Sequence, residues 1–137
     1  MNKYDQFNWW LTCIPDRIEE LRESLDPERA ARLDGSLASL DMLEAYLLET
    51  YPPRTLSLPE NSQVLDRYAS YVGDVAEKYF EDAVWTINVD DKENVNYNFP
   101  VLKLRGSHFN PFTAITASIH RKKGHYIREC VEKFKTV

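Results

Sequence analysis

Glycine is scarce in this sequence, and its scarcity excludes a large class of functional sites. The 137 residues contain four glycines, Gly35, Gly73, Gly106 and Gly124. Loops that cradle a phosphate need glycines at short, fixed spacing, because their backbone amides must approach the anion closely. These glycines are far apart, so the sequence has neither a nucleotide-binding P-loop nor a dinucleotide-binding fingerprint.

Cysteines and long hydrophobic runs are also nearly absent. Cys13 and Cys130 match no metal-binding or redox spacing, and they indicate a reduced protein of the cell interior rather than a disulfide scaffold. The apolar run nearest the N-terminus, residues 9–14, stops at Pro15. It is too short for a secretion signal or a membrane span. We therefore expect a cytoplasmic protein that does not associate with membranes.

The composition is typical of one folded domain. Hydrophobic residues make up 43% of the chain and aromatic residues 12%, which is enough to bury a core at about the commonest domain size. The sequence shows no internal repeat, low-complexity tract or linker. Residues 1–137 are therefore expected to form a single domain.

Charge is distributed unevenly along the chain. Residues 1–100 hold 9 basic and 20 acidic side chains, whereas residues 101–137 hold 8 and 2, for a net charge of −5. The acidic part would repel phosphates, so a nucleic-acid partner is not expected, and the basic C-terminal segment carries no nucleic-acid-reading motif. An acidic surface suits a basic protein partner. The alternative is that these charges serve solubility alone.

Apolar spacing predicts helices through most of the N-terminal part. Segments 6–14 and 16–25 have helical spacing, and a short turn of helix starts at Asp26-Pro27. A long helix is predicted from about residue 62 to residue 80. Gly73 lies in its interior, where it would let another element approach closely.

The helix in "LDGSLASLDMLEAYLLETYPP" has the clearest limits. Ser36 or Ser39 can cap its start, and Pro52 prevents its continuation. Its leucines form one stripe that is expected to face the core. The pattern assigns three carboxylates to its solvent side: Asp41, Glu44 and Glu49.

The remaining segments predict strands followed by helices. Residues 83–89 alternate as a half-buried strand, and residues 95–106 supply one strand interrupted at Pro100, or two. A helix capped by Asn110 and ended by Gly124 follows, and then a final short helix. The predicted class is therefore α+β: N-terminal helices, a small antiparallel hairpin or sheet, and C-terminal helices, with a single layer of helices packed on the sheet.

The sequence offers no grouping typical of catalysis or metal binding. His120 and His125 are not at the i,i+4 spacing that places two imidazoles on one helix face. Carboxylate pairs are numerous, but acid–base catalysis needs a raised pKa in a dry pocket rather than a solvated acidic face. Cys130 follows Glu129, whose charge opposes thiolate formation. We therefore expect no enzyme activity, metal or cofactor.

Trp9 and Trp10 are adjacent, so on a helix their side chains point about 100° apart and cannot both be central. An exposed tryptophan beside acidic groups is typical of a protein-binding surface. The alternative is that both tryptophans are buried between helices.

Four stretches together resemble a family of small bacterial α+β proteins. They are "LDGSLASLDMLEAYLLETYP", "LDRYASYVGDVAEKYF", "VWTINVDDKENVNYNFPVL" and "NPFTAI". The shared pattern is a leucine-rich helix before Tyr-Pro, a helix with tyrosine and glycine, a strand tryptophan and a proline-aromatic helix start. It covers roughly residues 15–130. One departure is "FEDAVW", where the family often has a glycine pair before the tryptophan.

The family is similar to the immunity partners of bacterial polymorphic and contact-delivered toxins. The resemblance implies a protein that neutralises a cognate toxin by binding it, with an acidic surface covering a basic active site. The expected partner is therefore a protein toxin with a basic surface. The candidate contacts are six carboxylates and two tryptophans: Asp74, Glu77, Glu81, Asp82, Asp90, Asp91, Trp9 and Trp10.

Two other functions stay open on the sequence alone. The first is a small enzyme that reverses a toxin's covalent modification, which a deep pocket holding a perturbed carboxylate or histidine would favour. The second is a structural or assembly module that self-associates, for instance as a homodimer paired through the hairpin edge.

Overall fold

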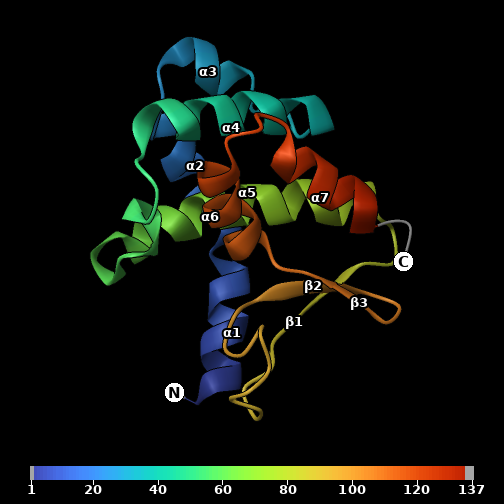
Figure 1. Ribbon diagram of the computed structural model, residues 1–137. Coiled ribbons are helices and arrows are strands. Elements are labelled where there is room, and N and C mark those ends of the chain that lie inside the picture. The colour runs from blue at the N-terminus through green and yellow to red at the C-terminus, as the bar shows by residue number, and fades with distance from the viewer. Residues whose placement is uncertain (1, 135–137) are drawn as a thin grey trace.

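The computed structural model describes residues 2–134 and confirms the α+β class, with helices before and after a small antiparallel sheet (Figure 1). Two single-turn 3₁₀ helices, Thr55–Ser57 and Pro59–Asn61, connect the helix of residues 37–50 to that of residues 62–79. The other elements are α1 Lys3–Thr12, α2 Ile14–Ser24, α3 Pro27–Ala31, α4 Leu37–Thr50, α5 Ser62–Tyr79, β1 Val84–Thr86, β2 Val101–Leu104, β3 Ser107–Phe109, α6 Pro111–Arg121 and α7 Tyr126–Phe134.

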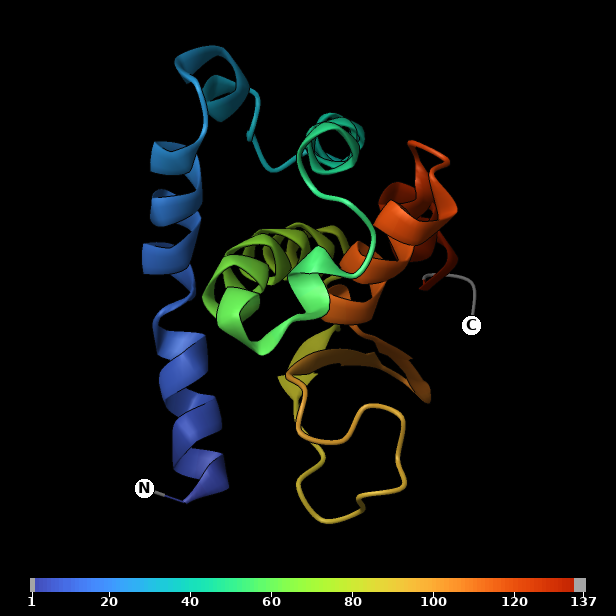
Figure 2. The same cartoon turned by 60° about the vertical axis from the view of Figure 1, so that its left-hand side comes forward.

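Helix α5 lies at the centre, and the other elements pack around it. Helix α2 runs along one side of α5, α6 packs on the other, and α4 and α7 pack on each other and on α6. Figure 2 shows α1 and α2 stacked end to end as one column, with the sheet beneath α5 and α6 and at the level of α1. Within residues 2–134, no helix combines the length and apolar character needed to cross a membrane.

Side-chain caps start three of the helices where the sequence predicts them. Asp26 accepts a hydrogen bond from the Arg29 backbone N–H at the start of α3. Ser36, rather than Ser39, caps α4, and its Oγ accepts from the Ser39 amide. Asn110 Oδ1 accepts two amides at the start of α6. Each cap satisfies N–H groups that have no partner within the first turn.

The predicted end of α6 is wrong. The helix ends at Arg121, and Lys122 is its C-cap in the left-handed conformation, with φ 56°. Gly124, with φ +90°, lies in the connection to α7 rather than at the helix end. The chain therefore uses two left-handed positions to reverse direction, and glycine is the residue that adopts this conformation at least cost.

The sheet has the order β1-β2-β3, and both pairings are antiparallel. The predicted pairing of the strand containing Trp85 with the later strand is confirmed, since Trp85 lies opposite Leu102. Within residues 95–106 there is one strand, β2, which starts directly after Pro100, and the part before Pro100 has only an isolated bridge between Tyr97 and Asn88. Strand β3 was not predicted, because three residues after a tight turn are too few for an alternating pattern to stand out.

Gly73 lies where another element approaches α5 closely, as predicted. A Cβ atom at this position would lie 2.2 Å from Cη2 of Trp85, far inside van der Waals contact. The indole of Trp85 therefore packs directly on the α5 backbone. Near the end of the same helix the side chain of Tyr79 is exposed, and Phe80 takes the core position.

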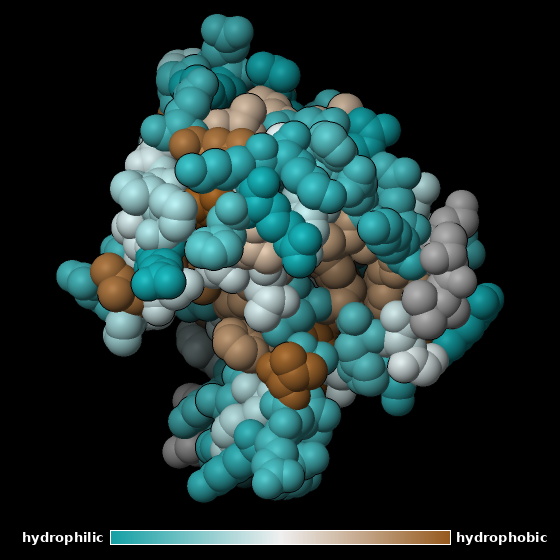
Figure 3. Space-filling model, in the orientation of Figure 1, coloured by the Kyte–Doolittle hydropathy of each residue, from teal (hydrophilic) through white to brown (hydrophobic). Residues whose placement is uncertain are grey.

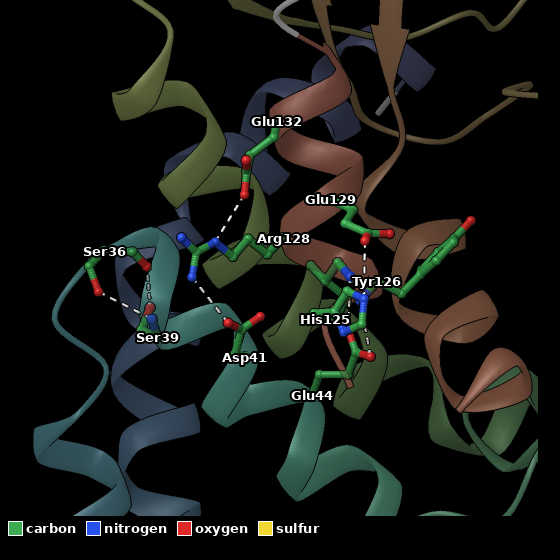
Figure 4. A network of polar contacts seen from close by, with 10 residues as sticks. Ser36, Ser39, Asp41, Glu44, His125, Tyr126, Arg128, Glu129 and Glu132 are labelled. Carbon is green, nitrogen blue, oxygen red and sulfur yellow. Dashed lines mark hydrogen bonds and ion pairs between the residues drawn. The ribbon is translucent and has the colours of Figure 1, made fainter. Parts of the chain in front are cut away.

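Glu44 is the clearest reversal of the sequence pattern. Its side chain is completely buried, at 0% exposure, although the pattern places it on the solvent side of α4. Its two oxygens accept the backbone N–H groups of Tyr126 at 3.2 Å and Ile127 at 2.8 Å (Figure 4). These amides are at the start of α7, where the helix dipole favours negative charge.

A second contact joins the same two helices. Arg128 donates to Asp41 at 3.1 Å and to Glu132 at 2.9 Å, so it links α4 to the first and second turns of α7 (Figure 4). The three side chains are partly exposed, and solvent screening limits the contribution of the ion pairs. The buried Glu44 contact is therefore the stronger link.

We predict that Glu44→Ala lowers the free energy of unfolding by about 2–4 kcal/mol, because it leaves two buried amides without an acceptor. Urea denaturation followed by circular dichroism measures the change. Glu49→Ala on the same helix is the matched control, with an expected loss below about 1 kcal/mol, since its ion pair with Arg29 is exposed. Equal losses for the two variants would contradict the role assigned to Glu44.

We predict that Gly73→Ala destabilises the protein by about 1–3 kcal/mol, despite a helix-propensity gain of about 1 kcal/mol, because its methyl group would displace the Trp85 ring. Thermal unfolding measures the effect. Gly106→Ala is the control, since an added Cβ there meets nothing within 4 Å. A Gly73→Ala protein as stable as the wild type would disprove the close packing.

Candidate functional site

The two adjacent tryptophans of α1 have different surroundings. The side chain of Trp9 is 62% exposed. Trp10 is half-buried, with its ring centroid 5.4 Å from that of Trp85 and 5.8 Å from that of Phe112. The alternative that both tryptophans are buried is therefore wrong. The rotation of about 100° from one helical residue to the next therefore separates the exposed Trp9 from Trp10, which anchors α1.

Helix α1 is held to the loop between β1 and β2. Lys3 Nζ donates to the Tyr97 hydroxyl at 2.6 Å, and the Tyr4 hydroxyl contacts Asp90 at 3.4 Å. Asn2 caps the helix by accepting the Asp5 amide. None of the residues of α1 is fully buried. The helix therefore presents much of its surface to solvent while its position is fixed by Trp10 and these polar contacts.

A hollow of about 290 Å³ lies between α1, the start of α5 and the loop before β2. Its apolar walls include Phe7, Trp10, Leu65 and Phe99. Asp66 also lines it. Apolar walls with a few polar groups are typical of binding sites, and this volume is at the small end of the range.

Asp66 has an unusual environment. Burial raises the pKa of its carboxyl group above the ordinary value of 3.8, more than a hydrogen bond from Trp10 and the charge of Arg17 lower it. The Trp10 indole N–H lies 3.4 Å from Asp66 Oδ1, which is long for such a bond. The negative charge of Asp66 is therefore only partly compensated by its neighbours.

Arg17 supports Trp10 from the column of α1 and α2. Its guanidinium lies 4.2 Å from the Trp10 ring centroid, donates to Ser70 Oγ at 2.7 Å and donates to the Trp10 carbonyl. Burial is the main cause of a lowered pKa for this group. Arg17 is not among the residues that line the hollow, so its charge acts on Asp66 from outside it.

Sequence reasoning did not find Asp66 or the hollow. Asp66 occurs in a helix with several other charged residues, and nothing in the pattern separates it from a solvated carboxylate. A signal was nevertheless present one turn later, where Ala69, Ser70 and Gly73 follow at helical spacing. Small residues on one helix face allow close packing of other elements, which buries a carboxylate at its edge.

The six predicted carboxylates do not form one cluster. Asp74 and Glu77 are neighbours on α5, and Asp74 pairs with Lys78 at 2.9 Å. Burial, followed by the charge of Asp74, raises the pKa of Glu77, whereas a hydrogen bond with Trp85 lowers it. These two carboxylates are therefore already engaged with groups of the protein itself.

The other four carboxylates are exposed and fall into two pairs at opposite ends of β1 (Figure 1). Glu81 and Asp82 precede β1, beside the exposed Val84. Asp90 and Asp91 follow it, in the loop that contacts α1. The extended strand between the pairs separates them in space, so the structure brings only Asp90 and Asp91 close to the helix that carries Trp9.

His108 and Cys130 line one hollow of about 400 Å³ between β3, α6 and α7. Within residues 2–134, no three His, Cys, Asp or Glu side chains are grouped so that they could hold a metal ion. Burial raises the pKa of Cys130, which weakens it as a nucleophile at neutral pH. His125 is paired with Glu129 at 3.1 Å (Figure 4).

The face of the molecule in Figure 3 is largely hydrophilic, and hydrophobic side chains reach its surface in scattered groups. Large permanent interfaces expose broad apolar areas in the free subunit. This face therefore carries no broad apolar area.

No protein-family model, curated protein or solved structure matches the chain.

We predict that Asp66→Asn gains stability relative to the wild type as pH rises from about 3 to about 7. The folded protein holds the Asp66 proton at pH values where the unfolded chain has lost it, so the contribution of Asp66 to wild-type stability falls as pH rises through this range. Urea denaturation at several pH values measures the difference in free energy of unfolding between variant and wild type.

Asp26→Asn is the control with the opposite sign. A hydrogen bond from the Arg29 amide lowers the pKa of Asp26, so this variant should lose stability relative to the wild type as pH rises. A pH-independent difference for Asp66→Asn would contradict the environment described for Asp66.

Proposed function

We propose that the protein is an immunity protein that binds a cognate bacterial toxin in the producer's cytoplasm and covers the toxin's active site. The observation that supports this most is Trp9, a tryptophan 62% exposed on a well-formed helix. Exposing so large an apolar side chain carries a solvation cost, and tryptophan is among the residues that contribute most to binding interfaces. The family resemblance of residues 15–130 points in the same direction.

The neighbours of Trp9 fit a protein partner with a basic surface. Asp5 lies one turn before Trp9 at i,i+4 spacing, and Gln6, at the rim of the hollow, lies at i,i+3 spacing. Asp90 and Asp91 add negative charge near the N-terminal end of α1. This charge would speed association with a basic toxin more than it would strengthen the final complex.

The hollow holds Asp66, a carboxylate with a raised pKa, which is a feature that would favour an enzyme. Its lining residues supply amides, one hydroxyl and Lys3, and none of them is a histidine or cysteine. Proton transfer by Asp66 would need a second group placed to activate a nucleophile or protonate a leaving group. We therefore interpret the hollow as a recognition site.

The edges of the sheet argue against assembly by strand addition. Strands β1 and β3 are the two edges and have three residues each. Such short edges offer few unpaired backbone groups to a second copy. Binding through side chains of α1 is the better-supported mode of interaction.

We predict that a tagged form of the protein recovers a stoichiometric partner from its native host, and that this partner kills cells unless the protein is co-expressed. Mass spectrometry identifies the partner, and a growth assay measures protection. Failure to recover any partner while the host expresses its toxins would overturn the proposal.

With the toxin in hand, Trp9→Ala is expected to weaken binding by about 30-fold or more, which is the size typical of a central tryptophan. Tyr79→Ala is the control, because Tyr79 is an exposed aromatic residue at the other end of β1 from the loop that contacts α1. Isothermal titration calorimetry measures both affinities. A larger loss for Tyr79→Ala would move the contact to the surface around Glu81 and Asp82.

Charge reversal distinguishes the two acidic pairs. Changing Asp90 and Asp91 to lysine should slow association by about 10-fold at low salt, and changing Glu81 and Asp82 should slow it less. Both double variants alter the net charge equally, so the comparison isolates position. Stopped-flow kinetics at two salt concentrations measures the rates, and equal rates for the two variants would exclude a steering role specific to the α1 end.

A further inference from the structure

We propose that the hollow between α1 and α5 receives one basic side chain, an arginine or lysine, of the partner protein. The hollow contains a carboxylate, Asp66, among aromatic and aliphatic walls. That this side chain belongs to a toxin rests on the proposed function. That the ligand is an organic cation on an apolar stem rests on the side chains that line the hollow.

The walls of the hollow suit the stem of such a side chain. Phe7, Leu65, Phe99 and Phe112 supply apolar and aromatic surface. Arginine and lysine carry several methylene groups that bury well against such surfaces while the charged end seeks a polar partner. The volume of about 290 Å³ is small for a drug-sized ligand but fits a single long side chain.

Asp66, which lines the hollow, suits the charged end of such a side chain. It is half-buried, and burial raises the pKa of its carboxyl group despite Trp10 and Arg17. An incoming cation would stabilise the negative charge of the carboxylate, which burial has deprived of part of its hydration. The carboxylate therefore favours a positively charged occupant over a neutral one. The Trp10 ring is already contacted by the guanidinium of Arg17, at 4.2 Å, so the cation would pair with Asp66 rather than with this ring.

Lys3 also lines the hollow and carries a positive charge. Its ammonium group donates to the Tyr97 hydroxyl at 2.6 Å and lies 4.9 Å from the centroid of the Tyr97 ring. It is thus directed toward the loop before β2. Asp66 is the carboxylate among the residues that line the hollow, so it is the group with which a cationic occupant would pair.

The location of the hollow also fits a partner anchored at Trp9. Gln6 lines the hollow and is one helical turn from Trp9 on the same helix. A protein surface that covers Trp9 therefore reaches the opening of the hollow without spanning another element. A basic side chain next to the contact of Trp9 would enter it.

The test uses the full chain and two small probes, N-acetyl-arginine amide and N-acetyl-citrulline amide, which differ in the charge of the terminal group. The Trp10 indole N–H resonance reports binding in NMR titrations, because that group contacts Asp66. The arginine probe is expected to shift the resonance saturably and to bind at least about 10-fold more tightly than the citrulline probe. No saturable shift, or equal affinities, would overturn the proposal.

Variants of two carboxylates locate the interaction. Asp66→Asn keeps the shape of the side chain and an acceptor for Trp10, and it is expected to weaken binding of the arginine probe by about 10-fold or more. Glu49→Gln on α4, outside the hollow, should leave the affinity unchanged. Equal effects of both variants would show that the probe responds to net acidity alone. The comparison of the two probes on the wild type does not depend on either variant.

The outcomes separate this inference from the proposed function. If the arginine probe binds but no toxin is recovered, the cation site is supported and the proposal that a toxin supplies the cation is wrong. If a toxin binds and Asp66→Asn leaves both probe and toxin affinities unchanged, the immunity function stands and the hollow plays no part in it.

Discussion

The buried contact between Glu44 and the start of α7 closes the fold. A carboxylate with no exposed surface needs several donors, and here two backbone amides and the helix N-terminus provide them. The contact fixes α7 against α4, and this position buries Ile127, Val131 and Phe134. Without this contact, α7, which packs on β3 and α6, would lose its fixed orientation. A polar interaction therefore determines where a large apolar face is placed.

The features that depended on neighbours in the sequence were predictable. Asn110 and Asp26 accept hydrogen bonds from backbone amides two or three residues away. The start and end of the helix of residues 37–50 are set by a serine and two prolines next to it in the sequence. Glu44 was not predictable, because its partners lie 82 and 83 residues later. A helical pattern assigns a charged residue to solvent unless it is known that another helix begins beside it.

In the candidate site too, local sequence predicts some features, and contacts between distant segments determine the others. Helical geometry predicts that Trp9 and Trp10 point in different directions, but only the packing of α1 against Trp85 decides which one is exposed. The carboxylates of residues 81–91 are close in sequence, and an extended strand nevertheless separates their two exposed pairs. Asp66 is buried by α1 and the loop before β2, elements that are distant from it in sequence, so its altered environment arises only in the folded chain.

The attachment of α1 has a consequence for local stability. This helix holds no fully buried residue and is fixed by one half-buried tryptophan and a few polar contacts. Such an element opens at a lower free energy than the core, so its amides should exchange with solvent without unfolding of α5 or α6. A partner seated across α1 would suppress this opening, and part of its binding free energy would be spent on ordering the helix it recognises. The protein would then be most rigid in the complex.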